Sequence, residues 1–293
     1  MQKLTAVIAA TVLTATACGS GSPPPTTSAH PFNTPFTNAR FYPAVVSSDL
    51  AVGNNRVLIG MFNSHDAPIG SPQTKMRVSF YNLAVSQSQP VTTKEARFVW
   101  AIHGVRGLWE ADGVRFDDAG QWGAAVTTSG GGIDSTSKVN FTVNEESIAP
   151  SVGEPAPASD SPTIGDVKNL QQITTDRHPS KRFYKTSIAQ AIARHENFVV
   201  VFATPKYCTS EVCGPTLELV KRIAPEFPKL TFIHVEVYTN LSNPSALKPA
   251  PAAVQWRLPS EPWTFVVDRH GTIAARFEGT MRPSDLKAAI KNL

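Results

Sequence analysis

Two cysteines five residues apart, Cys208 and Cys213, are the residues of this chain best suited to chemistry. An apolar run, Phe198–Phe202, leads towards the first of them, and a helix-like segment that contains Pro215 follows the second. Free backbone N–H groups and the helix dipole stabilise a thiolate where a strand leads into the start of a helix. The setting therefore predicts a redox-active pair, in which one thiolate attacks a disulfide and the other thiol resolves the mixed disulfide.

The spacing of this pair restricts how a disulfide can form between the two cysteines. Residues five apart on an uninterrupted helix are separated by about 7.5 Å along the axis and about 140° around it. Their Cα atoms then exceed the limit of about 7 Å that a disulfide tolerates. We therefore expect residues 208–213 to be looped, or the first helical turn to be unwound. Pro215 favours the loop, because proline is tolerated in a first helical turn but is costly deeper in a helix.

The elements that must hold the pair follow one another from about residue 182 to the end of the chain. The apolar pattern alternates along this stretch between strand-like and helix-like periods. A helix between two buried apolar strands implies a mostly parallel pairing in the centre of a sheet, and a later hairpin adds an antiparallel edge. The predicted order is strand 182–185, helix 187–195, strand 198–203, helix 215–224, strand 230–238, strands 263–267 and 272–278, and helix 284–291.

A second motif, EPWTFVVD at residues 261–268 followed by GTI at 271–273, lies later in the chain. It resembles the segment P-x-T-F-x-x-D-x-x-G-x-I around the cis-proline of TlpA-like extracytoplasmic oxidoreductases. Together with the cysteine pair after an apolar strand, this motif makes residues 181–293 similar to the thioredoxin fold. The resemblance implies thiol–disulfide exchange with protein dithiol and disulfide substrates. It also implies a redox donor or acceptor as partner, no cofactor and no bound metal.

The resemblance assigns roles to individual residues. An Ala-Thr pair that ends at Thr204 precedes Cys208, as a similar pair precedes the TlpA motif. This makes Cys208 the implied nucleophile and Cys213 the implied resolving thiol. Pro262, together with Trp263 and Thr204, is implied to shape the groove that receives the substrate.

The sequence departs from the family in two respects. The usual spacing is C-x-x-C, and an alternative register places Cys213-Gly214-Pro215-Thr216 on the family's CGPC, with threonine replacing the resolving cysteine. The family also carries a buried acid on the strand before the cysteines, where this chain has valines. Glu211, between the two cysteines, is left as a candidate for proton handling, and its other possible role is to cap the following helix.

Three other functions stay open for the same residues. The stretch TPKYCTSEVCG is close to the motif of bacterioferritin-comigratory peroxiredoxins, in which Thr204 would contact peroxide and Cys208 would attack it. Against this function, Pro262 stands where their supporting arginine would fall. EVCGPTLEL and His270 resemble Sco-type copper-binding proteins, since two thiolates and an imidazole suit Cu(I). The third alternative is a thioredoxin-fold binding module that lacks exchange activity.

The first residues have the features of a secretory signal peptide of the lipoprotein type. The apolar stretch 4–13 is too short to span a bilayer, and small residues lead from it to Cys18. This end resembles the bacterial lipobox, with Ala15 where Leu or Val is usual, and implies that Cys18 is lipidated. We predict a signal peptide over 1–17, a disordered tether over 18–38, and anchoring to the extracytoplasmic side of a bacterial membrane. Ordinary cleavage, which would leave a secreted protein, is the alternative.

The middle of the chain is β-rich and ends in a linker. Short runs of β-branched and aromatic residues between turn residues predict an Ig-like antiparallel β-sandwich over residues 39–148. The sequence DAGQW at 118–122 resembles the turn that enters strand F of such domains, with tryptophan replacing tyrosine. A Pro/Ser/Ala-rich stretch predicts a linker over 149–180, before the thioredoxin-like domain at 181–293. The predicted fold is therefore an all-β sandwich followed by an α/β thioredoxin-like domain.

The charge balance argues against one class of partner. The chain has 27 basic and 23 acidic residues, so its net charge is only +4. No basic stripe interleaved with aromatic residues is present in the sequence. We therefore expect no nucleic-acid partner.

Overall fold

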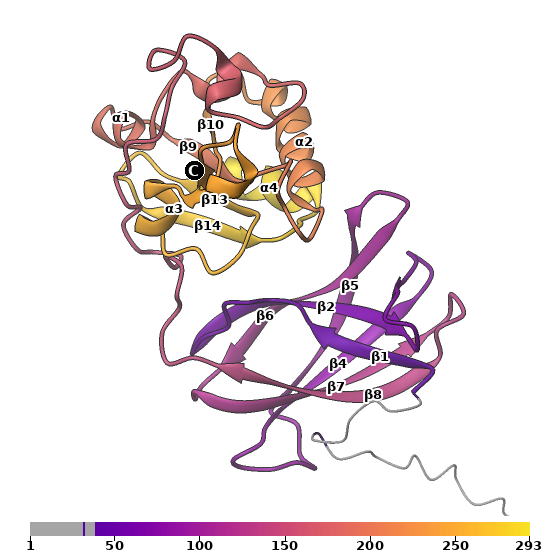
Figure 1. The fold of residues 1–293 in the computed structure, drawn as a ribbon. Helices are drawn as coiled ribbons and strands as arrows, with labels where there is room; N and C mark the ends of the chain where they lie inside the picture. The colour runs from indigo at the N-terminus through magenta and orange to yellow at the C-terminus, as the bar shows by residue number, and fades with distance from the viewer. Residues whose placement is uncertain (1–31, 33–38) are drawn as a thin grey trace, which may run out of the picture.

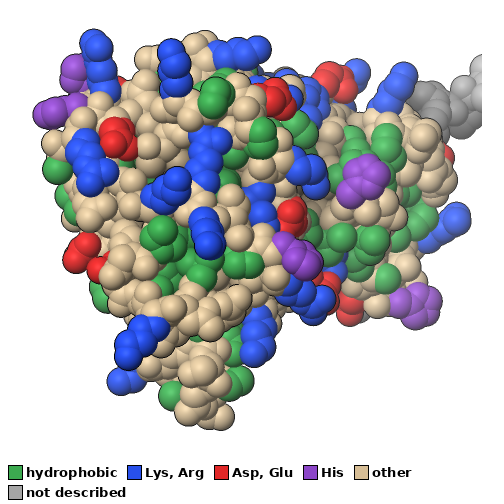
Figure 2. Space-filling view, turned by 90° about the horizontal axis from the view of Figure 1, so that it is seen from above, with side chains coloured by type: hydrophobic (Ala, Val, Ile, Leu, Met, Phe, Trp, Pro, Cys, Tyr) green, Lys and Arg blue, Asp and Glu red, His purple; other side chains and the backbone are tan. Residues whose placement is uncertain are grey.

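The computed structural model describes residue 32 and residues 39–293 (Figure 1). The predicted signal peptide, the lipidation site Cys18 and all of the predicted tether except Phe32 lie outside the described residues. Among the residues described, no helix is long and apolar enough to cross a membrane. On the face shown in Figure 2, Lys and Arg side chains are scattered among uncharged residues.

The N-terminal part is one antiparallel sheet that curls into a nearly closed barrel, called here the barrel (residues 41–143). Its strands follow the order β1-β2-β6-β5-β4-β7-β8, and the short β3 pairs with β2. β1 and β8, at the two ends of this order, lie near each other, so little of the sheet edge stays open. The strands are β1 (Phe41–Val45), β2 (Gly53–Asn63), β3 (Pro68–Ile69), β4 (Lys75–Asn82), β5 (Thr92–Ile102), β6 (Arg106–Phe116), β7 (Gly120–Ser129) and β8 (Ser135–Val143).

The predicted Ig-like sandwich is therefore wrong. A sandwich consists of two separate sheets packed face to face. In this chain β5 pairs with β4 through its first half and with β6 through its second half, which keeps the sheet continuous. Both architectures require inward apolar residues to alternate with outward polar ones, so the residue pattern alone does not distinguish them.

Aromatic side chains fill the interior of the barrel. Trp109 and Trp122 are almost completely buried there, together with Phe80 and Phe116. The indole Nε1 of Trp122 donates a hydrogen bond to the carbonyl of Asp118 at 2.9 Å. At the turn 118–122 the tryptophan indole therefore donates a hydrogen bond to the backbone, in place of a tyrosine hydroxyl.

The C-terminal part, called here the α/β region (residues 181–293), is built on a sheet in the order β10-β9-β13-β14. β9 and β10 are parallel, whereas β13 is antiparallel to both β9 and β14. Side chains of β9 alternate between the apolar clusters on the two faces of this sheet. The elements are α1 (Ile188–Ala193), β9 (Phe198–Phe202), α2 (Cys213–Ile223), β10 (Thr231–Val235), β11 (Tyr238–Thr239), β12 (Lys248–Pro249), α3 (Pro251–Gln255), β13 (Trp263–Val267), β14 (Ile273–Glu278) and α4 (Pro283–Lys291), with 3-10 helices at Leu170–Gln172, Lys181–Tyr184, Ala224–Glu226 and Pro244–Ala246.

Most elements predicted for this region are confirmed, and one is wrong. Ser187 caps α1, since its side chain accepts a hydrogen bond from the backbone N–H of Gln190 at 3.1 Å. Residues 182–185 do not form the predicted strand, because most of them belong to the 3-10 helix Lys181–Tyr184. Arg182 is used there to donate to three backbone carbonyls at and after the end of α2.

The beginning of the predicted linker pairs with β14 and the turn before it. The N–H of Gly153 donates to the carbonyl of Ile273 at 2.8 Å, and the N–H of Ile273 donates to Glu154 at 2.9 Å. The N–H of Ala156 donates to the carbonyl of Gly271 at 2.8 Å. These bonds fix the path of the chain as it enters the α/β region.

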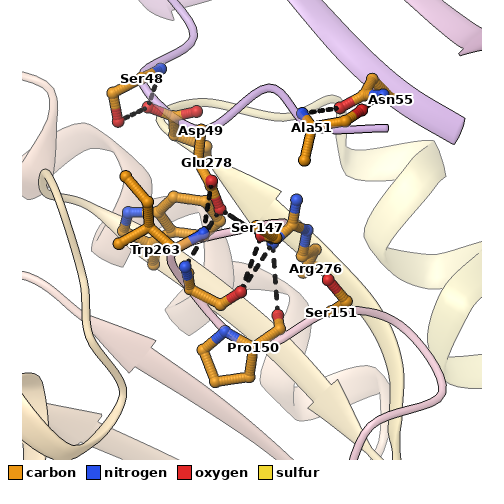
Figure 3. A network of polar contacts seen from close by, with 12 residues as sticks. Ser48, Asp49, Ala51, Asn55, Ser147, Pro150, Ser151, Trp263, Arg276 and Glu278 are labelled. Atoms are coloured by element: carbon orange, nitrogen blue, oxygen red, sulfur yellow. Dashed lines mark hydrogen bonds and ion pairs between the residues drawn. The ribbon is translucent and has the colours of Figure 1, made fainter. Parts of the chain in front are cut away.

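An ion pair joins the barrel side of the molecule to β14 (Figure 3). The guanidinium of Arg276 lies 3.0 Å from the carboxylate of Asp49, whose side chain has no exposed surface. Arg276 also donates to the hydroxyl of Ser147 at 2.5 Å and to the carbonyls of Ala149 and Pro150. The carboxylate of Asp49 in turn accepts hydrogen bonds from the same stretch of chain.

A second cluster of charges lies where the outer face of the barrel meets the chain after β14. Glu110 of β6 is 2% exposed and forms an ion pair with Arg56 at 2.8 Å and with Arg97 at 3.0 Å. Arg56 continues across the contact and donates to the backbone carbonyls of Glu278 and Thr280. The barrel is therefore held against the α/β region by buried polar groups as well as by packing.

Candidate redox site

Cys208 and Cys213 are joined by a disulfide. Their Cα atoms are 6.1 Å apart, within the usual range for a disulfide. Cys208 lies in a loop after β9, and Cys213 is the first residue of α2. The prediction that residues 208–213 are looped is therefore confirmed, and Pro215 lies in the first turn of the helix as expected.

The two sulfur-bearing residues differ in their access to solvent. Cys208 is 9% exposed, whereas Cys213 is fully buried. Both pack in the apolar cluster on the α2 face of the sheet, together with Val201 and Val266. The Sγ of Cys208 lies 3.2 Å from the hydroxyl of Ser210. An attacking group from outside therefore reaches Cys208 more easily than Cys213.

The residues predicted to shape the groove take different positions. Pro262 is buried, its peptide bond with Glu261 is cis, and its carbonyl accepts a hydrogen bond from Gly279. The side chain of Trp263 packs in the cluster on the sheet face opposite the disulfide, and its Nε1 donates to Ser260 at 3.1 Å. Thr204 is fully buried, and its hydroxyl accepts a hydrogen bond from the N–H of Val237 at 2.9 Å.

One residue close to the sulfurs was not predicted from the sequence. Donor atoms of Cys208, Cys213 and Glu261 all lie within 4.8 Å of one another. The carboxylate of Glu261 accepts a hydrogen bond from the backbone N–H of Thr204 at 2.8 Å, which ties β13 to the end of β9. The sequence feature that could have identified Glu261 is its position directly before Pro262. The resemblance to the TlpA motif implies that this proline, and therefore its neighbour, lies near the disulfide.

Burial changes the protonation of this acid. Loss of solvent raises the pKa of Glu261 from its ordinary value of 4.5 to about 7, against an opposing effect of hydrogen bonds from Thr204. A carboxyl group with this pKa is partly protonated at neutral pH. It can therefore both accept and donate a proton near the sulfurs.

Glu261→Gln is expected to stabilise the oxidised chain at pH 8 and to leave its stability nearly unchanged at pH 4, below the ordinary pKa of a glutamate. Because the folded-state pKa of Glu261 lies above its ordinary value, the folded chain retains a proton that the unfolded chain releases. The stability that this group contributes is lost as the pH rises from about 4.5 to about 7. Glutamine removes this loss, so calorimetry should show a melting temperature a few degrees higher at pH 8 only. An equal rise at both pH values would contradict the assignment.

A pocket of about 440 Å³, called here the barrel-side pocket, separates part of the barrel from the disulfide loop. Ser210 and Glu261 line it on the side of the disulfide. Arg106, at the start of β6, donates to the carbonyl of Ser210 at 2.9 Å and pairs with Glu211 at 3.2 Å. The end of the barrel formed by β5 and β6 points towards the α/β region (Figure 1). Outer residues of the barrel form the apolar wall, among them Val46, Leu58, Phe62 and Leu108.

Two other residues singled out in the sequence lie away from the sulfurs or are exposed. His270 is in the turn between β13 and β14, at the opposite end of β13 from Pro262, so the predicted copper alternative is not assembled. Glu211 is 69% exposed and faces Arg106. Among the described residues, Cys208, Cys213 and Glu261 form the one group of at least three His, Cys, Asp or Glu residues whose possible metal-donor atoms lie close together. Its two sulfurs are bonded to each other and offer no thiolate.

The comparisons with known proteins add no relative. No family model matches the chain, and neither a curated protein nor a solved structure matches it. What the chain shows by itself is a C-x4-C disulfide in a C-terminal α/β region, next to a half-buried acid and facing an antiparallel barrel.

Proposed function

We propose that this chain carries out thiol–disulfide exchange outside the cytoplasm, through a thioredoxin-like α/β region. The observation that carries the proposal is the place of the disulfide, between the end of a buried parallel strand and the first residue of a helix. Free N–H groups at the start of α2 favour a thiolate at this position.

The arrangement of the sheet supports the thioredoxin-like assignment. Parallel β9 and β10 are joined through α2, and the hairpin β13–β14 adds antiparallel strands on the other side of β9. The loop before β13 brings Glu261, the residue directly before Pro262, to the disulfide, which supports the resemblance of EPWTFVVD to the TlpA motif. Two features far apart in the sequence thus meet at one point of the fold.

The roles of the two cysteines follow from their exposure to solvent. Cys208 is the more exposed cysteine, so its thiolate is the nucleophile that meets a substrate disulfide. Cys213 lies behind it at the start of α2 and resolves the mixed disulfide. The barrel-side pocket is the approach for substrate, because Ser210 and Glu261 line it next to the sulfurs.

The location proposed is the outer face of a bacterial membrane, with Cys18 as the lipidated residue. An oxidising compartment suits a disulfide, and cytosolic thiols are kept reduced. The stretch before residue 39 would then separate the barrel from the bilayer. Protein dithiols and disulfides outside the cytoplasm are the proposed substrates.

Reduction of insulin disulfides in the presence of a dithiol donor tests the exchange. With Cys18→Ser as the background, we expect turnover, and we expect Cys208→Ser to abolish it because the mixed disulfide no longer forms. Cys213→Ser should retain the first attack and accumulate a mixed disulfide that mass spectrometry detects.

No turnover with any dithiol donor, or turnover that survives Cys208→Ser, would refute the proposal. Peroxide consumption measured on the same samples should stay at the level of free dithiol. Rapid consumption that depends on Cys208 would instead identify a peroxidase.

A further inference from the structure

Glu261 lies closer to the disulfide than the acid that the sequence offered for proton handling. Its carboxylate is within 4.8 Å of both sulfurs, whereas the carboxylate of Glu211 is 69% exposed and paired with Arg106. A group that exchanges protons with a buried thiol must be within direct reach or one water molecule away. Only Glu261 of these two carboxylates meets this condition with respect to Cys213, which is fully buried.

The charged groups around Glu261 have partners of their own. Three further charged residues line the barrel-side pocket that Glu261 faces, and they come from three different elements. Arg106 binds the disulfide loop, Glu278 accepts hydrogen bonds from Ser48, and Asp66 accepts one from the hydroxyl of Tyr42. Glu261 itself accepts hydrogen bonds from Thr204.

We propose that Glu261 is the proton-exchanging group of the Cys208–Cys213 dithiol. The proposal rests on the exchange function proposed above and names the residue that makes its second step possible. Thr204 holds the carboxyl group in place by its backbone N–H, so the acid approaches the disulfide from the proline loop. It does not come from the strand that leads into the cysteines, where this chain has valines.

The step is balanced as follows. The Cys208 thiolate attacks a disulfide R–S–S–R′, forms a Cys208–S–R bond and releases R′–S⁻, which takes a proton from water. The Cys213 thiol then gives its proton to the Glu261 carboxylate, and its sulfur attacks the sulfur of Cys208. The Cys208–Cys213 bond forms, the Cys208–S–R bond breaks, and R–S⁻ leaves with the proton from Glu261. Two electrons pass from the dithiol to the substrate disulfide, and Glu261 returns to its starting state.

The physical setting suits this task. Desolvation raises the pKa of Glu261 to about 7, which lies close to neutral pH and closer to that of a thiol than an ordinary carboxyl group would be. A proton therefore moves between the thiol and the carboxylate with a small energy difference in either direction. Cys213, which has no exposed surface, has no direct access to bulk water for the same transfer.

The two chemical steps can be separated with 4,4′-dithiodipyridine as the substrate disulfide. Reduced full-length chain in the Cys18→Ser background releases one thiopyridone when Cys208 attacks and a second when Cys213 resolves. With Glu261→Gln we expect the first release to stay within about threefold and the second to slow by about 100-fold or more at pH 7. The second rate should level off above pH 7 in the parent chain and should keep rising with pH in Glu261→Gln, where hydroxide must take the proton.

Matched variants keep the test decisive. Glu211→Gln, which removes the exposed carboxylate between the two cysteines, should leave both steps within twofold. Glu261→Asp keeps a carboxylate and should restore part of the second rate and the levelling of its pH profile. A preserved first release in Glu261→Gln shows that the site is folded, since Cys208 must still react.

The outcomes distinguish this inference from the function on which it rests. A parent chain that releases no thiopyridone, or only one equivalent, overturns exchange by this pair and with it the role of Glu261. A parent chain that releases two equivalents, with a second rate in Glu261→Gln within twofold of the parent at every pH, overturns the role of Glu261 alone. A slow second step in Glu211→Gln instead would assign the proton transfer to Glu211.

Discussion

Replacing Arg276 with methionine is expected to lower the free energy of unfolding by about 3–5 kcal/mol. The substitution keeps much of the side-chain volume but leaves the carboxylate of Asp49, which has no exposed surface, without its cation. It also removes the donors that serve Ser147, Ala149 and Pro150 (Figure 3). Because an unpaired buried charge has lost its solvation, the cost exceeds that of an ordinary surface pair. Equilibrium unfolding in urea, followed by tryptophan fluorescence, measures it.

Arg77→Met is the matched control for this substitution. Arg77 forms an ion pair with Glu95 at 2.8 Å on the barrel, and both side chains are about two-thirds exposed, at 65% and 68%. Surface pairs of this kind contribute about 0–1 kcal/mol. If Arg276→Met and Arg77→Met shifted the unfolding midpoint by the same amount, the pair of Asp49 and Arg276 would not hold the two parts together as described.

The disulfide site illustrates what local sequence can predict. For a disulfide to form, helix geometry required a loop between Cys208 and Cys213 or an unwound first helical turn, and the structure has the loop. Pro215 and the apolar run of β9 fixed where the helix and the strand had to be. These predictions depend on residues that are neighbours in the chain, so the chain itself contains the information.

Glu261 could not be assigned in the same way. Its proximity to the sulfurs depends on how β13 is placed against β9 and on a hydrogen bond from Thr204, which lies far away in the sequence. Its raised pKa comes from desolvation in the folded chain, and no local sequence pattern records burial of this kind. The sequence offered Glu211 as a candidate because it lies between the cysteines, but its side chain faces Arg106 and solvent.

The barrel shows a different limit of sequence patterns. The alternation of residues located its strands, because inward apolar side chains recur at every second position. Whether the strands form one continuous sheet or two depends on β5, which pairs with β4 through its first half and with β6 through its second half without any special residue type that would reveal it. The contacts between barrel and α/β region rest on charged residues such as Arg56 and Glu110, whose pairing is equally invisible in one sequence.

Glu110→Gln is expected to lower the free energy of unfolding by about 2–4 kcal/mol, since it removes the charge that Arg56 and Arg97 share. Glu110 is 2% exposed, and Arg282 at the start of α4 lies 3.8 Å from it as well. Glutamine has nearly the same size, so the effect measures the lost charge rather than a cavity. The cost is smaller than for a fully buried pair because Arg56 retains 14% exposure and its two backbone acceptors across the contact.

Glu95→Gln provides the comparison, because the same chemical change then falls on an exposed pair of the same barrel. We expect less than about 1 kcal/mol for this control in the same urea titration. The salt dependence of the two destabilisations separates the variants further. In 1 M NaCl the exposed charges around Glu95 are screened, whereas the buried cluster around Glu110 is largely unaffected. If Glu110→Gln cost no more than Glu95→Gln, the arginines would be sufficiently solvated without Glu110. The barrel would then be held to the α/β region mainly by the ion pair of Asp49 with Arg276 and by apolar packing.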